Sequence, residues 1–355
     1  MRLTPPPRVV DLSLLLAIVV SFATGLASLV SGTPDLWWVF ALHGVGGLAL
    51  VVALAWKLRR VAPRLRPSSW TRRTVASALA LAAAVAALGT GIFWSFGGNF
   101  QVLAWNAMNI HILFALLLAP PLFVHLLHRF RLPSRAEVTE RRTVLQYLLL
   151  VGGATLAWRL QRGIVQVLEL ADERRFTSSR QRGEEPGNTF PVTMWVADDP
   201  DPIDAGEWSL RVSGAVGRPS AFDYDALLDV EDDLRATLDC TSGWYTTQDW
   251  RGVSVGRLLD RVEPGPDATW VSFRSVTGYR FSLPIEEARG ALLATHVGGE
   301  ALSHGHGFPA RLVAPGRRGF QWVKWVEAVE VRESPDYGQW VAIFASGFTG
   351  TRSDG

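Results

Sequence analysis

Cys240 is the only cysteine among the 355 residues of the chain. It lies in the stretch ATLDCTSGWYTTQDW, after an apolar, strand-like run and before several aromatic residues. A lone cysteine cannot form an internal disulfide, so a role in a disulfide framework is excluded. The thiol is therefore a small buried apolar group, a nucleophile or a thiolate ligand of a metal. A nucleophile needs a base, and the only histidines in the later half of the chain, His296, His304 and His306, belong to no recognisable catalytic signature.

A second stretch, HGFPARLVAPGRRGFQWVKWVEAVEV, favours the metal-ligand role for Cys240. It covers residues 306–331 and places His306, Arg311 and Lys324 around turn residues. Charge-assisted and backbone hydrogen bonds from such groups suit a large anionic cofactor. Neither Arg311 nor Lys324 is expected to point into a dry core without a partner.

Two histidines lie at matched depth in separate apolar segments. His43 follows Trp37 by six residues, and His111 follows Trp105 by six. At 1.5 Å per residue, each imidazole would lie roughly 9 Å below the membrane interface where the tryptophans are expected. Two imidazoles on separate helices can bind one haem iron from both sides, so we predict one haem b held by His43 and His111. Alternatively, the two rings hydrogen-bond to helix backbones or to each other.

His125 and His128 do not extend this pattern to a second haem. His125 lies fourteen residues beyond His111, and the second apolar segment offers only Lys57 at that depth. We interpret His125 and His128 as residues that face the lipid headgroups.

Apolar runs near the N-terminus must position the histidines. The overall composition, with 48% hydrophobic and 19% charged residues, is an average over two parts of the chain that differ in composition. The long runs lie near residues 11–30, 37–56, 74–95, 105–127 and 143–158. Each of the first four approaches the ~20 residues that a helix needs to cross a bilayer, and the fifth is shorter. We predict a helical bundle of about five spans over residues 1–160, in contact with membrane lipid.

Basic residues predict the orientation of these spans. Seven lie from Lys57 to Arg73, after the second segment, and five lie from Arg129 to Arg142, after the fourth. The alternate loops carry none, which places the N-terminus in the cytoplasm and everything after Trp158 on the extracytoplasmic side. The last two basic residues also resemble a twin-arginine export signal, although the same positive-inside rule accounts for them equally well. No basic, aromatic-interleaved surface for a nucleic acid is present in the sequence.

The remainder of the chain resembles an ordinary globular protein. The polar stretch LADERRFTSSRQRGEEPGN indicates a linker, which we place at residues 161–187. From Thr189 onward, short runs such as WSLRVSG, TWVSFRSV and WVEAVEVRE alternate with Gly, Pro and Asp. This pattern predicts one mixed α+β, mainly β, domain over residues 188–355.

Two motifs together resemble the sulfite oxidase family of molybdopterin enzymes. HGFPARLVAPG followed by VKWVEAVEV is similar to the molybdopterin-binding part of that family. LDCTSGWYTTQDWRGVSVGRLLD resembles the cysteine loop of its bacterial single-domain members, which include periplasmic methionine sulfoxide reductases. The resemblance covers roughly residues 188–335 and implies a molybdenum–molybdopterin cofactor in this domain.

The resemblance also implies roles for individual residues. Those implied to bind the cofactor are Phe190, Cys240, His306, Arg311, Trp322, Val323 and Lys324. Cys240 would ligate molybdenum, His306 and Arg311 would contact the phosphate side of the pterin, and Lys324 would complete the pocket with the two residues before it. Phe190, in NTFPVT, matches the family pattern only loosely. We expect no counterpart of the C-terminal dimerisation domain or the soluble haem domain of the eukaryotic members.

The cysteine loop departs from the family pattern in a way that bears on the substrate. Sulfite-oxidising members place basic residues just after the ligand cysteine, whereas residues 241–245 here are neutral. Aromatic faces with a hydrogen-bonding edge, at Trp244 and Tyr245, suit a neutral sulfoxide or N-oxide. Tyr245 or Tyr279 is expected either to hydrogen-bond the substrate oxygen or to pack. A sulfite oxidase would instead need basic residues that are distant in sequence, such as Arg251, Arg274, Arg280 or Arg317.

The sequence thus predicts a membrane-anchored molybdenum oxidoreductase. It would exchange electrons between membrane quinones and an extracytoplasmic substrate through the haem, and would reduce a small or protein-borne S- or N-oxide. The alternatives are a sulfite-type oxidase and a catalytically silent binding or scaffold module. Loss of Cys240, Arg311 or Lys324 would mark the silent module, and all three are present.

Overall fold

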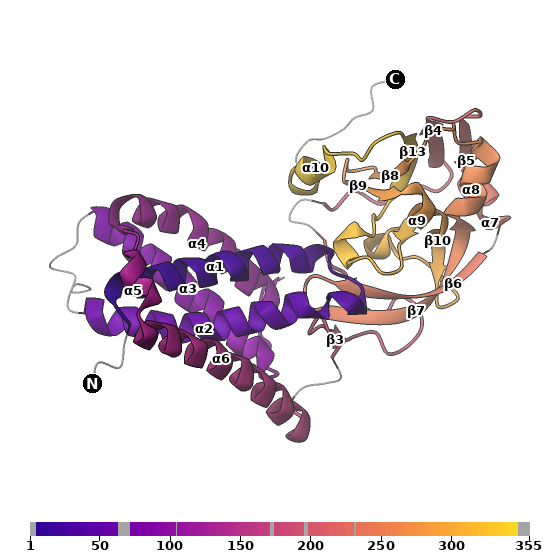
Figure 1. The fold of residues 1–355 in the computed structure, drawn as a ribbon. Helices are drawn as coiled ribbons and strands as arrows, with labels where there is room; N and C mark the ends of the chain where they lie inside the picture. The colour runs from indigo at the N-terminus through magenta and orange to yellow at the C-terminus, as the bar shows by residue number, and fades with distance from the viewer. Residues whose placement is uncertain are drawn as a thin grey trace. The chain divides into compact units, whose positions relative to one another are not determined.

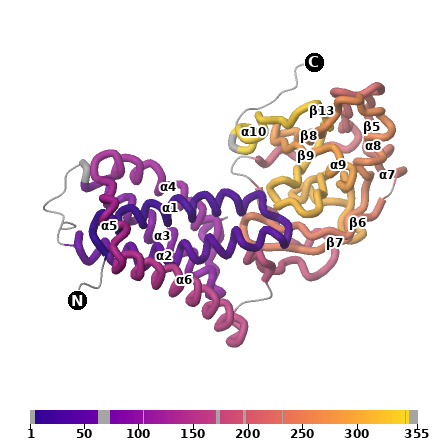
Figure 2. Tube along the Cα trace, viewed as in Figure 1, coloured from indigo at the N-terminus to yellow at the C-terminus, as the bar shows by residue number. Residues whose placement is uncertain are grey.

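The computed structural model describes residues 5–62, 72–103, 105–170, 174–194, 198–230 and 232–346. The chain divides into two compact units, Met1–Ser178 and Ser179–Gly355. The first unit is helical, and the second is built on two sheets (Figure 1, Figure 2). Residues 63–71, which carry part of the predicted basic loop, lie outside the described residues.

Five helices among the described residues of the first unit are long and apolar enough to cross a membrane. They are α1 (Pro7–Val30), α2 (Trp37–Val61), α3 (Arg72–Ser95), α4 (Ala107–Arg129) and α6 (Arg141–Val167). Four of them cover a whole predicted apolar run, whereas α4 begins two residues inside its run because Trp105 and Asn106 form a short strand. Helix α6 continues into the first residues of the predicted linker. Asn106 begins α4 with a capping box, in which its side chain accepts from the backbone N–H of Asn109.

The long helices form two antiparallel hairpins, in which α1 packs along α2 and α3 packs along α4 (Figure 1). Helix α6 packs against α2. A Cβ atom on Gly44 would lie 2.7 Å from the indole of Trp158, so this glycine allows the close approach of α6 to α2. The short elements of this unit are η1 (Pro34–Leu36), β1 (Gln101–Val102), β2 (Trp105–Asn106) and α5 (Arg135–Thr139).

The second unit contains a six-stranded and a five-stranded sheet. The first sheet comprises β3 (Arg180–Gln181), β6 (Asp232–Cys240), β7 (Trp244–Ser254), β10 (Leu292–Val297), β11 (Glu300–Ala301) and β12 (Arg311–Val313). The second comprises β4 (Ser209–Gly214), β5 (Ser220–Asp223), β8 (Trp270–Ser275), β9 (Arg280–Pro284) and β13 (Val326–Arg332). The strands β4, β8 and β13 lie in the runs that predicted them, so the mixed, strand-rich architecture is confirmed.

One apolar core joins the two sheets and includes the fully buried Trp250 and Phe273. Strand β7 shows why the core forms there, since inward residues alternate with outward ones along most of its length. The helical segments of this unit are α7 (Tyr224–Leu228), α8 (Val255–Val262), α9 (Ile285–Arg289), α10 (Gln339–Ala345), η4 (His304–His306) and η5 (Gly319–Gln321). The chain between η4 and β13 carries most of the predicted cofactor residues.

Candidate functional site

Cys240 is the last residue of β6, at the turn that leads into β7. The strand register pairs Cys240 directly with Trp244, and the backbone N–H of Gly243 donates to the Cys240 carbonyl at 3.0 Å. Gly243 has a φ of 88°, a conformation that a residue with a side chain adopts only with strain. The thiol is buried, and its sulfur accepts from the backbone N–H of Ser242 at 3.5 Å.

Arg311 begins β12 and is buried near the thiol. Its Nη1 donates to the His306 carbonyl at 2.9 Å, and its guanidinium lies over the rings of Trp250 and Trp322. Burial lowers the pKa of Arg311 to about 10, while the charge of Cys240 acts in the opposite direction. The buried Nε of Arg311 has no hydrogen-bond partner among the described residues. An anionic group that accepts from this N–H would remove the cost of leaving it unpaired.

Lys324 is a second cation whose pKa is affected by the charge of Cys240. Its Nζ donates to the carbonyls of Thr193 and Gly305, at 2.9 and 2.6 Å. Burial, followed by the charge of Arg311, lowers the pKa of Lys324 to about 7, and Cys240 partly opposes this change. An anion bound beside Lys324 would therefore stabilise its protonated form.

His306 is held in its neutral form between two oxygen atoms. Its Nδ1 lies 2.7 Å from Ser303 Oγ, and its Nε2 lies 2.9 Å from the Phe190 carbonyl oxygen. The imidazole also contacts the Phe190 ring, with the ring centroids 4.1 Å apart. Burial lowers the pKa of His306 to about 4. The structure thus brings together Phe190 and His306, two residues that the family resemblance implied, and His306 anchors the segment around Phe190.

We expect the acid stability of the second unit to depend on His306. Because the folded pKa of about 4 is below the ordinary value of 6.5, the unfolded chain binds the proton more tightly, and stability falls as pH drops through this window. His306→Gln keeps a donor to the Phe190 carbonyl but cannot titrate. Thermal unfolding of cofactor-free protein should therefore show a smaller loss of Tm between pH 7 and pH 5 in this variant. Equal losses in the variant and the wild type would contradict the assignment.

An ion pair beside Cys240 is the main feature that the sequence analysis missed. Nη1 of Arg318 lies 2.5 Å from Oδ1 of Asp239, and the two side chains are 5% and 2% exposed. Arg318 also donates from Nη2 to the Cys240 carbonyl at 3.3 Å, and Ser179 Oγ donates to Asp239 at 2.7 Å. The pair fixes the backbone of the cysteine loop from the side of η5. The sequence gives only two weak indications of this ion pair, an aspartate directly before the cysteine and the arginines of the RRG turn.

Breaking this ion pair should destabilise the cysteine loop strongly. Arg318→Met leaves the Asp239 carboxylate buried without its cation, which costs about 3–5 kcal/mol. Hydrogen exchange of the β6 and β7 amides should be accelerated accordingly. The double variant Arg318→Met/Asp239→Leu removes both charges and should recover most of the protection. Unchanged exchange in the single variant would show that the pair does not hold the loop.

Three of the four basic residues proposed for a sulfite site form ion pairs elsewhere in the unit. Ion pairs join Arg251 to Asp233 at 3.3 Å, Arg280 to Asp336 at 2.6 Å and Arg317 to Glu287 at 2.5 Å. Arg274 lies at an exposed position of β8. The positive charge near Cys240 comes instead from Arg311, Lys324 and the paired Arg318.

The two tyrosines considered for substrate binding lie in different surroundings. Tyr245 follows Trp244 in β7, where side chains alternate between faces, and its hydroxyl lies 3.5 Å from Gln181 Oε1. Tyr279 is buried, its hydroxyl donates to the Phe320 carbonyl at 2.5 Å, and burial raises its pKa. A catalytic role for Tyr245 stays a prediction.

The residues around Cys240 fit a molybdenum–pterin cofactor with a phosphate. A soft thiolate suits the metal, and the buried Arg311 and Lys324 suit the anionic part. Gly307 has a φ of 111°, and a Cβ atom there would lie 3.1 Å from that of Lys324 and 3.2 Å from that of Arg311. The glycine therefore permits the tight turn that brings these two side chains together. Trp322 and Val323 are buried beside them.

His43 of α2 and His111 of α4 lie together within the first unit. Their ring centroids are 5.9 Å apart, and the ring planes are inclined at 84°. Two metal–nitrogen bonds of roughly 2 Å each, together with the two half-rings, add up to about 6 Å between centroids. The spacing therefore fits a single metal ion bound between the two imidazoles, as a haem iron would be.

Each of these histidines is oriented by the helix that precedes it. Nδ1 of His43 lies 2.9 Å from the Ser21 carbonyl oxygen, and Nδ1 of His111 lies 2.8 Å from that of Ala87. A carbonyl partner fixes the proton on Nδ1 and leaves the lone pair on Nε2. Neither Nε2 has a hydrogen-bond partner among the described residues. The backbone bonds anticipated as an alternative to haem ligation are thus present, and they leave Nε2 available to a metal.

The two hairpins position their histidines by the same construction. One turn after each acceptor carbonyl is a glycine, and a Cβ atom on Gly25 or Gly91 would lie 3.4 or 3.0 Å from Cε1 of the facing imidazole. The matched residues are Ser21, Thr24, Gly25 and His43 in one hairpin, and Ala87, Thr90, Gly91 and His111 in the other. The first unit therefore contains an internal structural repeat.

The repeat continues toward the other end of the hairpins, but the matched residues there are of different chemical types. Lys57 and His125 each lie fourteen residues beyond the paired histidines. Lys57 is bound to Asp11 at 3.1 Å, whereas Nδ1 of His125 lies 2.7 Å from Ser77 Oγ. His128 is exposed and bonds to a carbonyl of its own helix. A second pair of histidines is absent from this level of the described hairpins.

Comparison with known proteins agrees with the site in the second unit. Residues 197–340 match the family model described as "Oxidoreductase molybdopterin binding domain". The chain is 33% identical to a protein-methionine-sulfoxide reductase catalytic subunit MsrP of Xanthomonas campestris, over 35% of this chain and 44% of that protein. It is 26% identical to an MsrP of Gluconobacter oxydans, over 60% of this chain and 78% of that protein.

A similarity to a solved structure covers a comparable part of the chain. The sulfane dehydrogenase SoxCD of Paracoccus pantotrophus matches 38% of this chain and 40% of its own, with 26% identity and a TM-score of 0.36. The chain thus spans less than half of the Xanthomonas relative and most of the Gluconobacter one. The family match, together with the buried thiol and cations, confirms the predicted enzyme class. Residues 197–340 form a molybdopterin-binding oxidoreductase domain of the sulfite oxidase and methionine sulfoxide reductase type.

Proposed function

We propose that this protein is a membrane-anchored molybdenum oxidoreductase that carries electrons from the quinone pool, through one haem b, to an S- or N-oxide. In this proposal the long helices of the first unit span the membrane with the N-terminus in the cytoplasm. The molybdopterin domain then acts on the extracytoplasmic side. The proposal joins the enzyme class of the second unit to an electron path through the first.

One observation carries the proposal, the pair of His43 and His111 on helices that can cross a membrane. Their spacing and their available Nε2 atoms suit a haem iron, which transfers one electron at a time. A molybdenum site exchanges two electrons with its substrate. A haem in the same chain can therefore connect a two-electron donor in the membrane with the molybdopterin domain.

When bound, the molybdenum cofactor supplies oxygen-atom transfer coupled to two-electron chemistry. Cys240 would ligate the metal, and the backbone N–H of Ser242 donates to its sulfur. Arg311 would hold the phosphate side of the pterin, with its Nε as a donor. His306, whose two ring nitrogens already meet Ser303 and Phe190, would instead fix the segment around Phe190 beside the pterin. Lys324 would complete the pocket, and the Asp239–Arg318 pair would keep the cysteine loop in place.

A neutral oxide is the substrate class that the local charges support. Arg318 is neutralised by Asp239, and Arg311 and Lys324 are the groups assigned to the cofactor phosphate. An anionic substrate would then lack a dedicated cation in a partly dehydrated site. The names of the two bacterial relatives, methionine sulfoxide reductases, point to the same class. Reduction of a sulfoxide consumes two electrons and two protons, and yields a thioether and water.

The same cations favour one competing function, sulfite-type oxidation. If Arg311 or Lys324 faces the substrate instead of the pterin phosphate, an anion could bind beside the metal. The two functions are separated by supplying reduced dye with methionine sulfoxide, dimethyl sulfoxide or trimethylamine N-oxide, and oxidised dye with sulfite. We expect oxide reduction to be the efficient reaction. Sulfite oxidation as the only efficient reaction would overturn the substrate assignment.

A further inference from the structure

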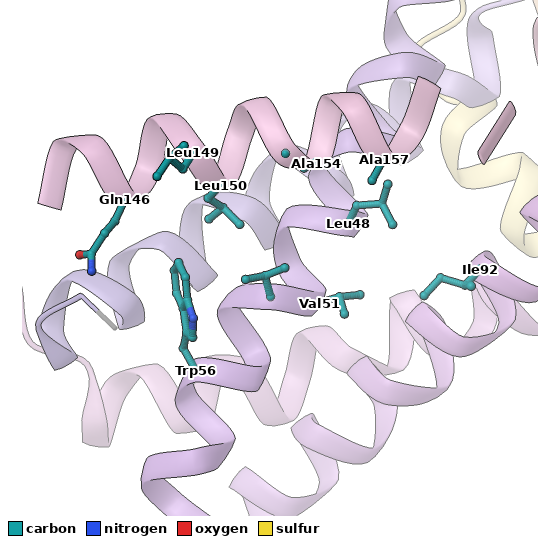
Figure 3. Close-up of a pocket in the computed structure, with 11 residues that line it drawn as sticks. Leu48, Val51, Trp56, Ile92, Gln146, Leu149, Leu150, Ala154 and Ala157 are labelled. Atoms are coloured by element: carbon teal, nitrogen blue, oxygen red, sulfur yellow. The ribbon is translucent and has the colours of Figure 1, made fainter. Parts of the chain in front are cut away.

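A groove in the first unit has one polar end and otherwise apolar walls. It has a volume of about 440 Å³ and lies among α2, α6 and the C-terminal part of α3. Figure 3 shows Trp56 and Gln146 at one end and Ile92 at the opposite end, with leucine, valine and alanine side chains between them. An elongated apolar ligand with a polar head at one end would match this lining.

The polar end presents two donors that the protein leaves unused. The indole N–H of Trp56 and the side-chain amide of Gln146 make no hydrogen bond to any described residue. Both side chains are half-buried on helices that can cross a membrane. In hydrocarbon an unpaired donor is costly, so both groups need an acceptor from a ligand, from lipid or from water.

The groove also lies beside the paired histidines. Its α2 wall begins at Leu48, five residues beyond His43, which is roughly 8 Å along the helix axis. Its far end at Ile92 adjoins Gly91, the residue against which His111 packs. The apolar part of a ligand in the groove would therefore lie alongside the proposed haem, and its polar head, near Trp56, would lie thirteen residues, or roughly 20 Å along the helix axis, from His43.

We propose that this groove is the binding site for an isoprenoid quinol. The two ring oxygens would meet the donors of Trp56 and Gln146, and the apolar tail would extend along α2 and α6 toward Ile92. This inference rests on the proposed function, which requires a two-electron donor in the membrane. The quinol would release two electrons, one at a time, to the haem iron and two protons to water at the Gln146 end, and would become a quinone.

Gly153 provides a way to test the groove without disturbing the helices. It lies on the groove wall, and a Cβ atom there would meet nothing within 4 Å, so the side chain of Gly153→Leu can leave the helix without strain and occupy the groove. Gly152 is equally open but does not line the groove. Because neighbouring residues on a helix point about 100° apart, Gly152→Leu is a matched control. Gln146→Leu removes one donor and keeps the apolar volume.

The measurement is the rate at which decylubiquinol reduces the haem of the full-length protein, followed by stopped-flow absorbance. This rate does not depend on molybdenum, so it separates the groove from the chemistry of the second unit. We expect Gly153→Leu to lower it at least about tenfold, and Gln146→Leu to raise the quinol concentration needed for half-maximal rate about tenfold. Gly152→Leu should match the wild type. Quinone extracted from the purified protein should fall in parallel in Gly153→Leu.

Several outcomes would overturn the proposal. An unchanged rate and quinone content in Gly153→Leu, or equal losses in Gly152→Leu, would show that the groove holds lipid chains or water. A wild-type protein whose haem is reduced by dithionite but not by the quinol would exclude a quinol site and leave the molybdenum assignment intact. If no haem is bound, the proposed function fails, and the quinone content of the two glycine variants still decides the groove.

Discussion

Replacing Cys240 with alanine should reduce turnover to less than about a thousandth of the wild-type rate, because loss of a group at the reacting centre commonly has an effect of this order. The haem spectrum should not change, since the substitution lies in the second unit and the paired histidines lie in the first. The assay is reduction of methionine sulfoxide with a reduced dye as donor. Molybdenum content, measured on the same samples, should fall with the rate.

Thr237→Ala is a suitable control for this variant. Thr237 lies on the same strand, β6, and its hydroxyl bonds to that of Thr247 across the hairpin. Its removal should leave both molybdenum content and turnover close to those of the wild type. A Cys240→Ala protein that retains molybdenum and full turnover would exclude the thiolate assignment and restore the reading of Cys240 as a buried apolar residue.

His43→Ala and His111→Ala should each lower the haem content at least tenfold, because removal of an axial nitrogen affects metal binding more than the 10- to 100-fold typical of supporting residues. The wild type should bind one haem b per chain in a pyridine haemochrome assay. Quinol-driven turnover should be lost with the haem, while dye-driven turnover persists. His128→Ala is the matched control, because His128 is exposed and bonds only within its own helix in the described structure.

A count of two haems per chain would contradict the single-site prediction. It would make His125 a ligand and would require Lys57 to leave Asp11, to which it is bound at 3.1 Å. Full haem content in both His43→Ala and His111→Ala would instead remove the paired histidines from the account altogether.

The sequence was sufficient to predict the helical part of the fold and the pairing of its histidines. Long apolar runs determine helix positions almost alone, because in a bilayer every backbone polar group must be satisfied within the helix. Because each histidine follows a tryptophan by six residues, the two were expected at one depth, and the structure places their ring centroids 5.9 Å apart. The repeat between the hairpins was not visible, because it depends on which backbone carbonyl each imidazole meets, as with Ser21 and Ala87.

The molybdopterin site was predicted only as far as its motifs extend. Phe190, His306 and Arg311 were named from the resemblance, and in the structure both Phe190 and Arg311 hydrogen-bond to His306. The Asp239–Arg318 pair joins two segments that are far apart in the chain. Such a contact is decided by the packing of η5 against β6, for which local sequence patterns give no cue. For the same reason the neutral residues after Cys240 did not reveal the positive charge around it, which Arg311, Arg318 and Lys324 bring from distant parts of the chain.

The most direct test of the account is the reoxidation of the reduced haem by a sulfoxide under anaerobic conditions. Protein with dithionite-reduced haem and no excess reductant is mixed with methionine sulfoxide, and the haem absorbance is followed. We expect reoxidation of the haem in the wild type but not in Cys240→Ala, with one sulfoxide reduced for every two electrons that the haem and the molybdenum release together. A haem that stays reduced in the wild type, or is oxidised equally fast in Cys240→Ala, would contradict electron flow from the haem through molybdenum to an oxide.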